Sequence, residues 1–443
     1  MITLKRKIDR FLIDWKHRQN HKPLIVKGAR QIGKTFSIDL FGRGHYKNVI
    51  SINFILQPAY KSIFDNGFEV ETIVKNLTFI NPGLRVEPHE TLIFFDEIQA
   101  CPSAATSLKS FCADGRYDVI CSGSLMGINY REIESNSVGY KEDYEMFSLD
   151  FEEFLWAKGY TDEIISRLRE KLYTLTPYTQ SEFDTLSDIF KDYMIVGGMP
   201  AVVDSYISNG NFADTLSIQR QLLKDYEEDI TKYAVGLAKG RILNVYNHIS
   251  VFLARENKKF MISKLSPHSR NREYVGVVEC LGNAGIVNVC YCLDLLELPL
   301  RGNYNQSIYK LYYQDTGLLI GSLDEEAQID LRNNRNFSTY KGALYENVVA
   351  DMLRKARYDL YYYRNEKSTI EIDFILRTAD SLVPIEVKAS DGVPKSLQKL
   401  TEGRNPEIKF GIKLCHRNLG YNGNFFTIPY FMTFALREFL RNR

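Results

Sequence analysis

The segment at residues 28–35, Gly-Ala-Arg-Gln-Ile-Gly-Lys-Thr, constrains the fold of this 443-residue chain most, because it fits the pattern G-x-x-x-x-G-K-[ST]. An apolar run at residues 23–28 precedes it and predicts a buried strand, and a helical pattern follows it. In such a loop the glycines let backbone N–H groups turn towards phosphate oxygens, and the N-terminus of the next helix adds its dipole. The sequence therefore predicts a phosphate-binding loop, in which Lys34 contacts the β- and γ-phosphates of ATP and Thr35 offers its hydroxyl to Mg²⁺. The alternative, an ordinary glycine-containing turn, does not account for the flanking strand and helix. The residues that we expect to contact ATP here are Gly28, Ala29, Arg30, Gln31, Ile32, Gly33, Lys34 and Thr35.

A second motif, TLIFFDEI at residues 91–98, places Asp96 and Glu97 at the end of an apolar run. Buried carboxylates are costly unless something uses them. In nucleotide hydrolases the first such carboxylate holds Mg²⁺ and the second activates the attacking water. We therefore expect Asp96 to bind the ATP-bound Mg²⁺, and Glu97 and Lys34 to be catalytic. Ser122 ends the next predicted strand, from which it would contact the γ-phosphate. The alternative is an exposed acidic strand end beside an ordinary Ser-Gly strand end.

Short apolar runs alternate with helical stretches in the first part of the chain, which predicts an α/β domain with a parallel sheet that ends near residue 155. Residues 160–235 have a helical pattern that is interrupted at Gly197–Pro200. A helix at residues 340–357 precedes a second set of short strands. The predicted strands are residues 23–28, 47–54, 91–98, 117–124, 359–364, 371–377, 383–389 and 409–415.

Composition excludes several classes of protein. The 56 Lys and Arg residues and 55 Asp and Glu residues leave a net charge of +1, which excludes a globally basic coat protein but not a local basic face. The seven cysteines show no paired CxxC spacing, so we expect neither a disulfide framework nor structural zinc, and a reducing cytoplasmic location. No run approaches the ~18 apolar residues of a membrane-spanning helix, so we expect no membrane association.

Together these motifs resemble a family. GARQIGKT, LIFFDEIQACP, CSGSLMG and EMFSLDFEEFLWA are similar to segments of bacterial and archaeal AAA-type ATPases that also carry a winged helix and a PD-(D/E)xK nuclease-like domain. GGMPAVV, AGIV and the tail GALYENVVADML…EIDFIL…PIEVKAS fit the same family. The resemblance implies an AAA-like P-loop domain with a parallel sheet, a helical and winged-helix middle, and a restriction-endonuclease-like α/β domain. The implied boundaries are 1–155 for the ATPase domain, 156–238 for a helical lid or linker, 239–335 for the winged helix and 336–443 for the nuclease-like domain.

The chain departs from this family at one place. Relatives often have a Gly-Arg pair before the LDFEEFL segment, whereas Val138–Lys141 stands there in this sequence. An arginine finger is therefore not assigned by the match. Arg131, Lys141 and an arginine from a neighbouring subunit of a homo-oligomer remain alternatives.

In the tail, two short strands predict a hairpin that carries Asp373 on one strand and Glu386 and Lys388 on the other. The two-residue period of a strand puts Glu386 and Lys388 on one face. We expect Asp373, Glu386 and Glu346, from the preceding helix, to converge on one Mg²⁺ or Mn²⁺, with Lys388 as the catalytic cation of a deoxyribonuclease. Gln398 and Lys399 would lie near the phosphate backbone. The alternative is a solvated strand face, or a nuclease-like fold without activity.

Residues 239–290 concentrate positive charge. They hold eight Lys or Arg residues and three Glu, so this segment predicts contact with DNA phosphates. Arg270 and Arg272 stand at the start of a predicted helix, where recognition helices contact DNA. The resemblance identifies this region as the winged helix. The alternative is a helical linker with a solvated basic face.

Three functions compete. The first is an Mg²⁺-dependent ATPase that acts on DNA and is coupled to the nuclease-like tail. The second is a nucleotide-dependent switch that binds DNA or a protein, with an inactive tail. The third, a metabolic P-loop kinase, fits least, because a small-molecule kinase needs neither a basic winged helix nor a carboxylate tail.

Overall fold

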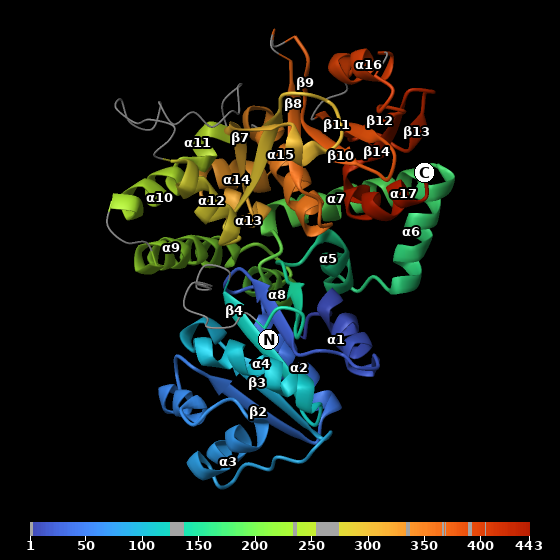
Figure 1. The fold of residues 1–443 in the computed structure, drawn as a ribbon. Coiled ribbons are helices and arrows are strands. Elements are labelled where there is room, and N and C mark those ends of the chain that lie inside the picture. The colour runs from blue at the N-terminus through green and yellow to red at the C-terminus, as the bar shows by residue number, and fades with distance from the viewer. Residues whose placement is uncertain are drawn as a thin grey trace. The chain divides into compact units, whose positions relative to one another are not determined.

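The computed structural model describes residues 3–443 except 125–136, 234–236, 254–273, 334–336, 366, 368, 389–391 and 404. These residues form two compact units (Figure 1). The smaller unit consists of Lys5–Ser148 with Asn283–Gly285, and the rest of the chain forms the larger unit. Each unit is described by itself below.

A parallel sheet is the centre of the smaller unit, as the sequence predicts. The four predicted strands all form, and β1, β3 and β4 are fully or largely buried, whereas the edge strand β2 is only partly buried. A fifth strand was not predicted, since its sequence Glu-Asp-Tyr-Glu is polar. The spatial order is β2 (Asn48–Asn53), β3 (Thr91–Asp96), β4 (Asp118–Ser124), β1 (Leu24–Gly28) and β5 (Glu142–Glu145).

Helices cover the sheet because alternate strand residues point to opposite faces. The first helix is amphipathic, and it buries Ile8, Leu12 and Trp15. One large apolar cluster joins Ile25, Ile93 and other strand residues to the helices of one face. The helical segments of this unit are α1 (Lys7–His17), α2 (Lys34–His45), η1 (Pro58–Phe64), α3 (Val70–Ile80), η2 (Ile98–Ala100) and α4 (Pro102–Asp114).

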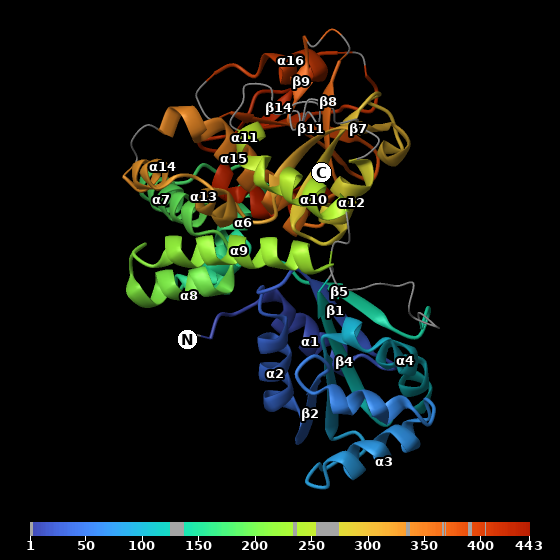
Figure 2. The same ribbon diagram turned by 90° about the vertical axis from the view of Figure 1, so that its left-hand side faces the viewer.

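The larger unit begins with a helical region that matches the expectation for residues 160–235. Asp150 starts the first helix with a capping box, in which its side chain accepts from the backbone N–H of Glu153 at 2.9 Å. Figure 2 shows α8 and α9, which pack against each other. The helices up to the first strand of this unit are α5 (Phe151–Ala157), α6 (Asp162–Thr174), α7 (Gln180–Val196), α8 (Pro200–Asn209), α9 (Thr215–Tyr233), α10 (Leu237–Asn247), α11 (Ile249–Leu253) and α12 (Val275–Asn283).

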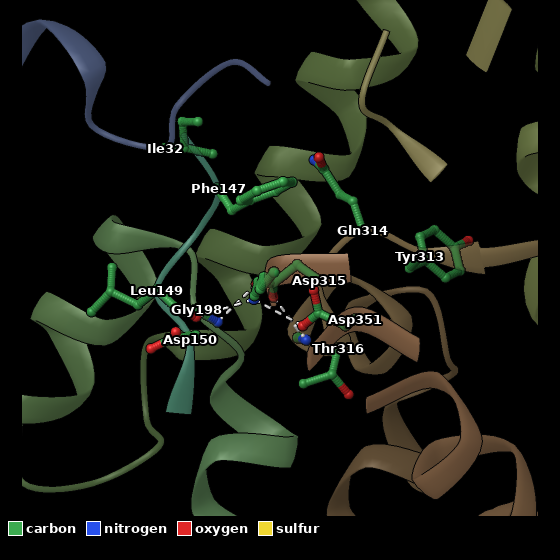
Figure 3. Close-up of polar contacts among 12 residues, drawn as sticks. Ile32, Phe147, Leu149, Asp150, Gly198, Tyr313, Gln314, Asp315, Thr316 and Asp351 are labelled. Carbon is green, nitrogen blue, oxygen red and sulfur yellow. Dashed lines mark hydrogen bonds and ion pairs between the residues drawn. The ribbon is translucent and has the colours of Figure 1, made fainter. Parts of the chain in front are cut away.

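The break between α7 and α8 is a close backbone approach. A Cβ atom on Gly198 would lie 1.9 Å from the carbonyl oxygen of Leu149, so only glycine fits there. The Gly198 N–H donates to the Asp315 carboxylate at 2.8 Å, and Lys355 and Asp351 complete this buried polar group (Figure 3). Burial raises the pKa of Asp351 to about 8, although the charge of Lys355 opposes this rise. The motif GGMP therefore has a structural role in this unit.

Two sheets follow. The first has the order β7–β6–β8–β9, and the second has the order β10–β11–β12–β14–β13. Their strands are β6 (Val287–Leu293), β7 (Tyr304–Tyr313), β8 (Leu360–Arg364), β9 (Glu371–Ile372), β10 (Phe374–Arg377), β11 (Leu382–Lys388), β12 (Gly411–Cys415), β13 (Gly420–Tyr421) and β14 (Phe425–Pro429). The helical segments among them are η6 (Leu300–Gly302), α13 (Thr316–Gly321), α14 (Glu325–Arg332), α15 (Phe337–Lys355), α16 (Lys395–Thr401), η7 (Tyr430–Ala435) and α17 (Leu436–Arg441).

The sequence predicts three domains after residue 155, whereas the structure has one compact unit there. Strand β6 pairs in parallel with β8, so one sheet spans the predicted boundary at residues 335/336. The predicted hairpin of the tail is confirmed, because β10 and β11 are antiparallel neighbours. The winged helix and the nuclease-like domain stay predictions.

Candidate nucleotide-binding site

The phosphate loop lies between β1 and α2, as predicted. Gly28 ends the strand, where a Cβ atom would lie 2.3 Å from the carbonyl oxygen of Met146, so glycine is required by this close approach. Gly33 precedes the helix with a φ of 93°, and Gln31 also has a positive φ, of 61°. A positive φ in a residue other than glycine is strained and is often found at functional sites. The two glycines of the motif therefore stand where the backbone needs glycine, at a close approach and at a positive φ.

Arg6 stabilises the phosphate loop through hydrogen bonds, a role that no sequence pattern indicates. Its guanidinium donates to the carbonyl oxygens of Ile32 at 2.9 Å and Phe147 at 2.7 Å. Arg6 is itself buried, so these charge-assisted bonds are shielded from water. The planar fork of arginine lets one side chain join the phosphate loop to the segment after β5.

Lys34 points back into its own loop. Its ammonium donates to the carbonyl oxygens of Gly28 at 3.1 Å and Ala29 at 2.6 Å. Burial lowers the pKa of Lys34 to about 8, while the negative charges of Glu97 and Asp96 oppose this fall. The lysine of the motif is thus held beside the two predicted carboxylates.

The carboxylate of Asp96 is surrounded by four uncharged hydrogen-bond donors. The Thr35 hydroxyl lies 3.3 and 3.4 Å from its two oxygens, and the Ser122 hydroxyl donates to Oδ1. The Asn53 amide donates to Oδ2 at 2.9 Å, and the backbone N–H of Glu97 donates to Oδ1 at 3.0 Å. The carboxylate is buried and has no lysine or arginine among these partners. It is therefore positioned beside Thr35, as expected for two ligands of one Mg²⁺.

The structure brings Ser122 to Asp96 because β4 lies directly between β1 and β3. Asn53 was not predicted. It ends β2 in register with Asp96, so its place follows from strand pairing that the sequence does not show. Parallel strands end at one edge of a sheet, and ligands bind there in open α/β sheets.

Glu97 has a φ of 54°, which is uncommon for this residue type and places it at the start of η2. Its carboxylate accepts a hydrogen bond from the Gln99 amide. Of the arginine-finger alternatives, Arg131 lies outside the described residues, and Lys141 is bound to Asp143 at 2.7 Å. The finger therefore stays unassigned.

The predicted DNA-contacting residues Arg270 and Arg272 lie outside the described residues, as does most of the basic segment. The described part that follows is helix α12 and strand β6. DNA contact by this segment stays a prediction.

In the tail, Glu386 and Lys388 lie on one face of β11, as predicted, with 2.5 Å between Oε1 and Nζ. Glu386 also accepts from the backbone N–H of Leu397 at 3.1 Å. Asp373 reaches the same strand and accepts from the backbone N–H of Val387 at 2.8 Å. The predicted strand at residues 371–377 is divided into β9 and β10, and Asp373 lies at the break between them, whereas Glu386 lies on β11.

Glu346 is paired with a lysine. Among the described residues, no group of three or more His, Cys, Asp or Glu side chains is placed to hold a metal ion. The convergence of Glu346, Asp373 and Glu386 on one cation stays a prediction. Next to Glu346 the structure places Lys310, whose ammonium lies 3.1 Å from Glu346 and 3.0 Å from Glu371. Burial alone would lower the pKa of Lys310, but the charges of Glu346, Asp373 and Glu371 outweigh it and raise this pKa well above its usual value.

The family models that match the chain divide it into three parts. Residues 20–155 match an AAA domain, in agreement with the phosphate-loop motif and the parallel sheet. Residues 187–328 and 341–431 match two domains of unknown function, DUF8612 and DUF4143. No curated protein matches the chain.

Several solved structures share a distant likeness. They include the Aeropyrum pernix ORC1 protein in complex with DNA, which is 13% identical with a TM-score of 0.31, covering 76% of this chain and 94% of that one. The AMPPCP-bound DnaA from Aquifex aeolicus is 14% identical with a TM-score of 0.28, covering 62% and 85%. A point variant of RuvB from Thermotoga maritima is 14% identical with a TM-score of 0.30, covering 64% and 87%. Likeness at these TM-scores decides nothing about function.

In the part of the chain that the structure describes, no helix combines the length and apolar composition needed to span a membrane.

Proposed function

We propose that this protein binds and hydrolyses ATP with Mg²⁺ in its AAA-type domain, and that it couples the nucleotide state to contact with DNA. The observation that carries the proposal is the surroundings of Asp96, which receives hydrogen bonds from Thr35, Ser122 and Asn53 at the carboxyl edge of the sheet. In this proposal Thr35 and Asp96 hold Mg²⁺, Lys34 contacts the β- and γ-phosphates, and Glu97 activates the attacking water.

The test of the ATP part is nucleotide binding by Lys34→Ala. Removing the ammonium deletes a charge-assisted contact worth roughly 1.5–3 kcal/mol, so ATP affinity should fall about 10- to 100-fold. Lys47→Ala is a matched control, because Lys47 is half-exposed, pairs with Glu87 and stands before β2, at the other edge of the sheet. Equal ATP affinity in Lys34→Ala and Lys47→Ala would contradict the proposal.

DNA is proposed as the partner on the charge of residues 239–290. Each Lys or Arg that contacts duplex phosphate lowers the slope of log affinity against log salt by ~0.9, so the double variant Arg270→Ala/Arg272→Ala should flatten the slope by about 2. Arg167→Ala/Lys191→Ala removes the same charge from exposed positions on α6 and α7 and is the control. A salt-independent interaction in the intact protein would indicate a protein partner instead.

A metal-dependent deoxyribonuclease activity of the tail is the second candidate. It is favoured by one observation, the placement of Glu386 and Lys388 on β11 with Asp373 hydrogen-bonded to the backbone N–H of Val387 between them. Incubation of the whole chain with DNA and Mg²⁺ or Mn²⁺ tests it. Cleavage that is lost in Asp373→Asn, with the protein still folded, would support this candidate. Intact DNA under all these conditions would leave the tail as an inactive docking module.

A further inference from the structure

The buried carboxylates of the larger unit surround a lysine. Lys310 on β7 and Glu346 on α15 are both almost fully buried, with side chains 2% and 3% exposed. An isolated buried charge is costly, so each of these groups depends on a partner. The ammonium of Lys310 lies 3.1 Å from Glu346 and 3.0 Å from Glu371, which gives it two carboxylates.

Aromatic side chains complete the surroundings of this ion group. The hydroxyl of Tyr312 donates to the same Oε1 of Glu346 that Lys310 contacts. The ring of Tyr362, on β8, lies 4.8 Å from the Lys310 ammonium, within the range of a cation–π contact. Arg364 adds a second, longer contact to Glu371, at 3.8 Å. Lys310 thus has a negative charge on two sides and an aromatic ring on a third.

This arrangement occupies Oε1 of Glu346 with an ammonium and a hydroxyl, so a divalent cation at that oxygen would have to displace them. A metal ligand bond of roughly 2.0–2.6 Å to the Glu346 oxygen would need the space that the Lys310 ammonium and the Tyr312 hydroxyl occupy. The chemistry of the group is that of an internal ion pair, in which the lysine supplies the positive charge that a metal supplies elsewhere. The contacts also join three elements that are distant in the sequence, β7, β9 and α15.

We infer that Lys310 is the resident cation of this carboxylate group, and that the group joins β7, β9 and α15 without a divalent metal. Removal of Lys310 would then leave Glu346 and Glu371 without their shared cation. The variant Lys310→Ala would also open space beside them, so the group should gain affinity for a divalent cation.

The experiment compares Mn²⁺ binding and thermal unfolding of the nucleotide-free chain. All proteins carry Asp96→Asn, so that the nucleotide site does not contribute. The parent should bind no Mn²⁺ that depends on Glu346, and Mn²⁺ should leave its melting temperature unchanged. Lys310→Ala should melt roughly 10 °C lower, as expected for a broken buried ion pair, and saturating Mn²⁺ should restore several degrees. Lys409→Ala removes a lysine of the same tail from an exposed ion pair with Asp380, and it should show neither effect.

A charge-neutral double variant covers the case in which Lys310→Ala does not fold. Lys310→Met with Glu346→Gln removes both charges at similar volume, so it should fold, melt within a few degrees of the parent and bind no Mn²⁺. A double variant that is as unstable as Lys310→Met alone would overturn the inference, because neutralisation of Glu346 would then not be the role of the lysine. The inference would equally be overturned by a parent protein that binds Mn²⁺ and loses this binding in Glu346→Gln.

Discussion

In the smaller unit, the partners of Asp96 are neutral: two hydroxyls, an amide and a backbone N–H. In the larger unit, Glu346 is paired with the ammonium of Lys310 and also accepts from the hydroxyl of Tyr312. Neutral donors position a carboxylate but leave its negative charge uncancelled, so it can still attract a cation. An adjacent ammonium group neutralises the carboxylate charge, so no further cation is attracted. The same residue types, a carboxylate and a lysine, therefore form a site suited to a ligand in one unit and a closed structural contact in the other.

The position of the lysine explains this difference. Lys34 lies near Asp96 and Glu97 but donates to the carbonyl oxygens of Gly28 and Ala29, and its pKa is lowered to about 8. Lys310 donates directly to two carboxylates, and its pKa is raised. Proximity of opposite charges in a sequence motif is thus a weaker guide to function than the identity of the hydrogen-bond partners.

The largest effect is expected for Glu97→Gln. The amide keeps the shape of the side chain but cannot accept the proton of the attacking water, so kcat for ATP should fall by about 10²–10⁴ while nucleotide binding persists. Steady-state ATPase rates and direct binding of ATP measure the two quantities. Glu386→Gln makes the same chemical change at the tail hairpin and should leave the ATPase rate unaltered. ATP hydrolysis at the wild-type rate in Glu97→Gln would contradict the assignment of the base.

The second prediction replaces one carboxylate by an amide in each unit. Asp96→Asn should abolish Mg²⁺-dependent ATPase activity. Glu346→Gln should leave ATPase activity intact but destabilise the larger unit by roughly 3 kcal/mol, since Lys310 loses its buried counter-charge. Chemical denaturation and ATPase assays of both variants measure these effects. An ATPase defect in Glu346→Gln, or unaltered stability, would remove the contrast between the two carboxylates.

Sequence reasoning found the elements that have short-range patterns. The phosphate loop, the strand that ends in Asp96 and the hairpin with Glu386 and Lys388 follow from motifs and periodicity, and the structure places them as expected. Ser122 was found because it also ends a predicted strand.

The residues that sequence reasoning missed have partners far along the chain. Arg6 binds Ile32 and Phe147, which lie 26 and 141 positions away, and Lys310 binds Glu346 at a separation of 36. Neither residue stands in a motif, so no local pattern indicates its role. The lysine partner of Glu346 was missed for the same reason, because it comes from a strand outside the predicted tail domain.

The third prediction concerns pH, and it separates the two lysines. With a pKa of about 8 in the free protein, Lys34 is mostly protonated at pH 7 and mostly neutral at pH 9, so ATP affinity should fall about tenfold over this range. The folded-state pKa of Lys34 lies below its unfolded value, so its contribution to the stability of the free protein should rise above pH 8. The pKa of Lys310 is raised, so its contribution should be constant below the unfolded-state value of ~10.4. Fluorescent-nucleotide titrations at each pH measure the affinity, and a flat profile would contradict the position of Lys34.

The smallest effect is expected for Asn53→Ala. This change removes one neutral donor to Asp96, at 2.9 Å, and leaves the Thr35, Ser122 and Glu97 donors in place. A single hydrogen bond contributes about 1 kcal/mol, so the Mg²⁺ concentration for half-maximal ATPase activity should rise about fivefold. Asn53 also accepts from the backbone of the next turn, so a change in that turn must be distinguished from a change at Asp96. Gln57→Ala provides this control, because Gln57 accepts from the Asn53 N–H but has no bond to Asp96. An equal shift in both variants would assign the effect to the turn, whereas a shift in Asn53→Ala alone would show that neutral donors position Asp96 for its cation.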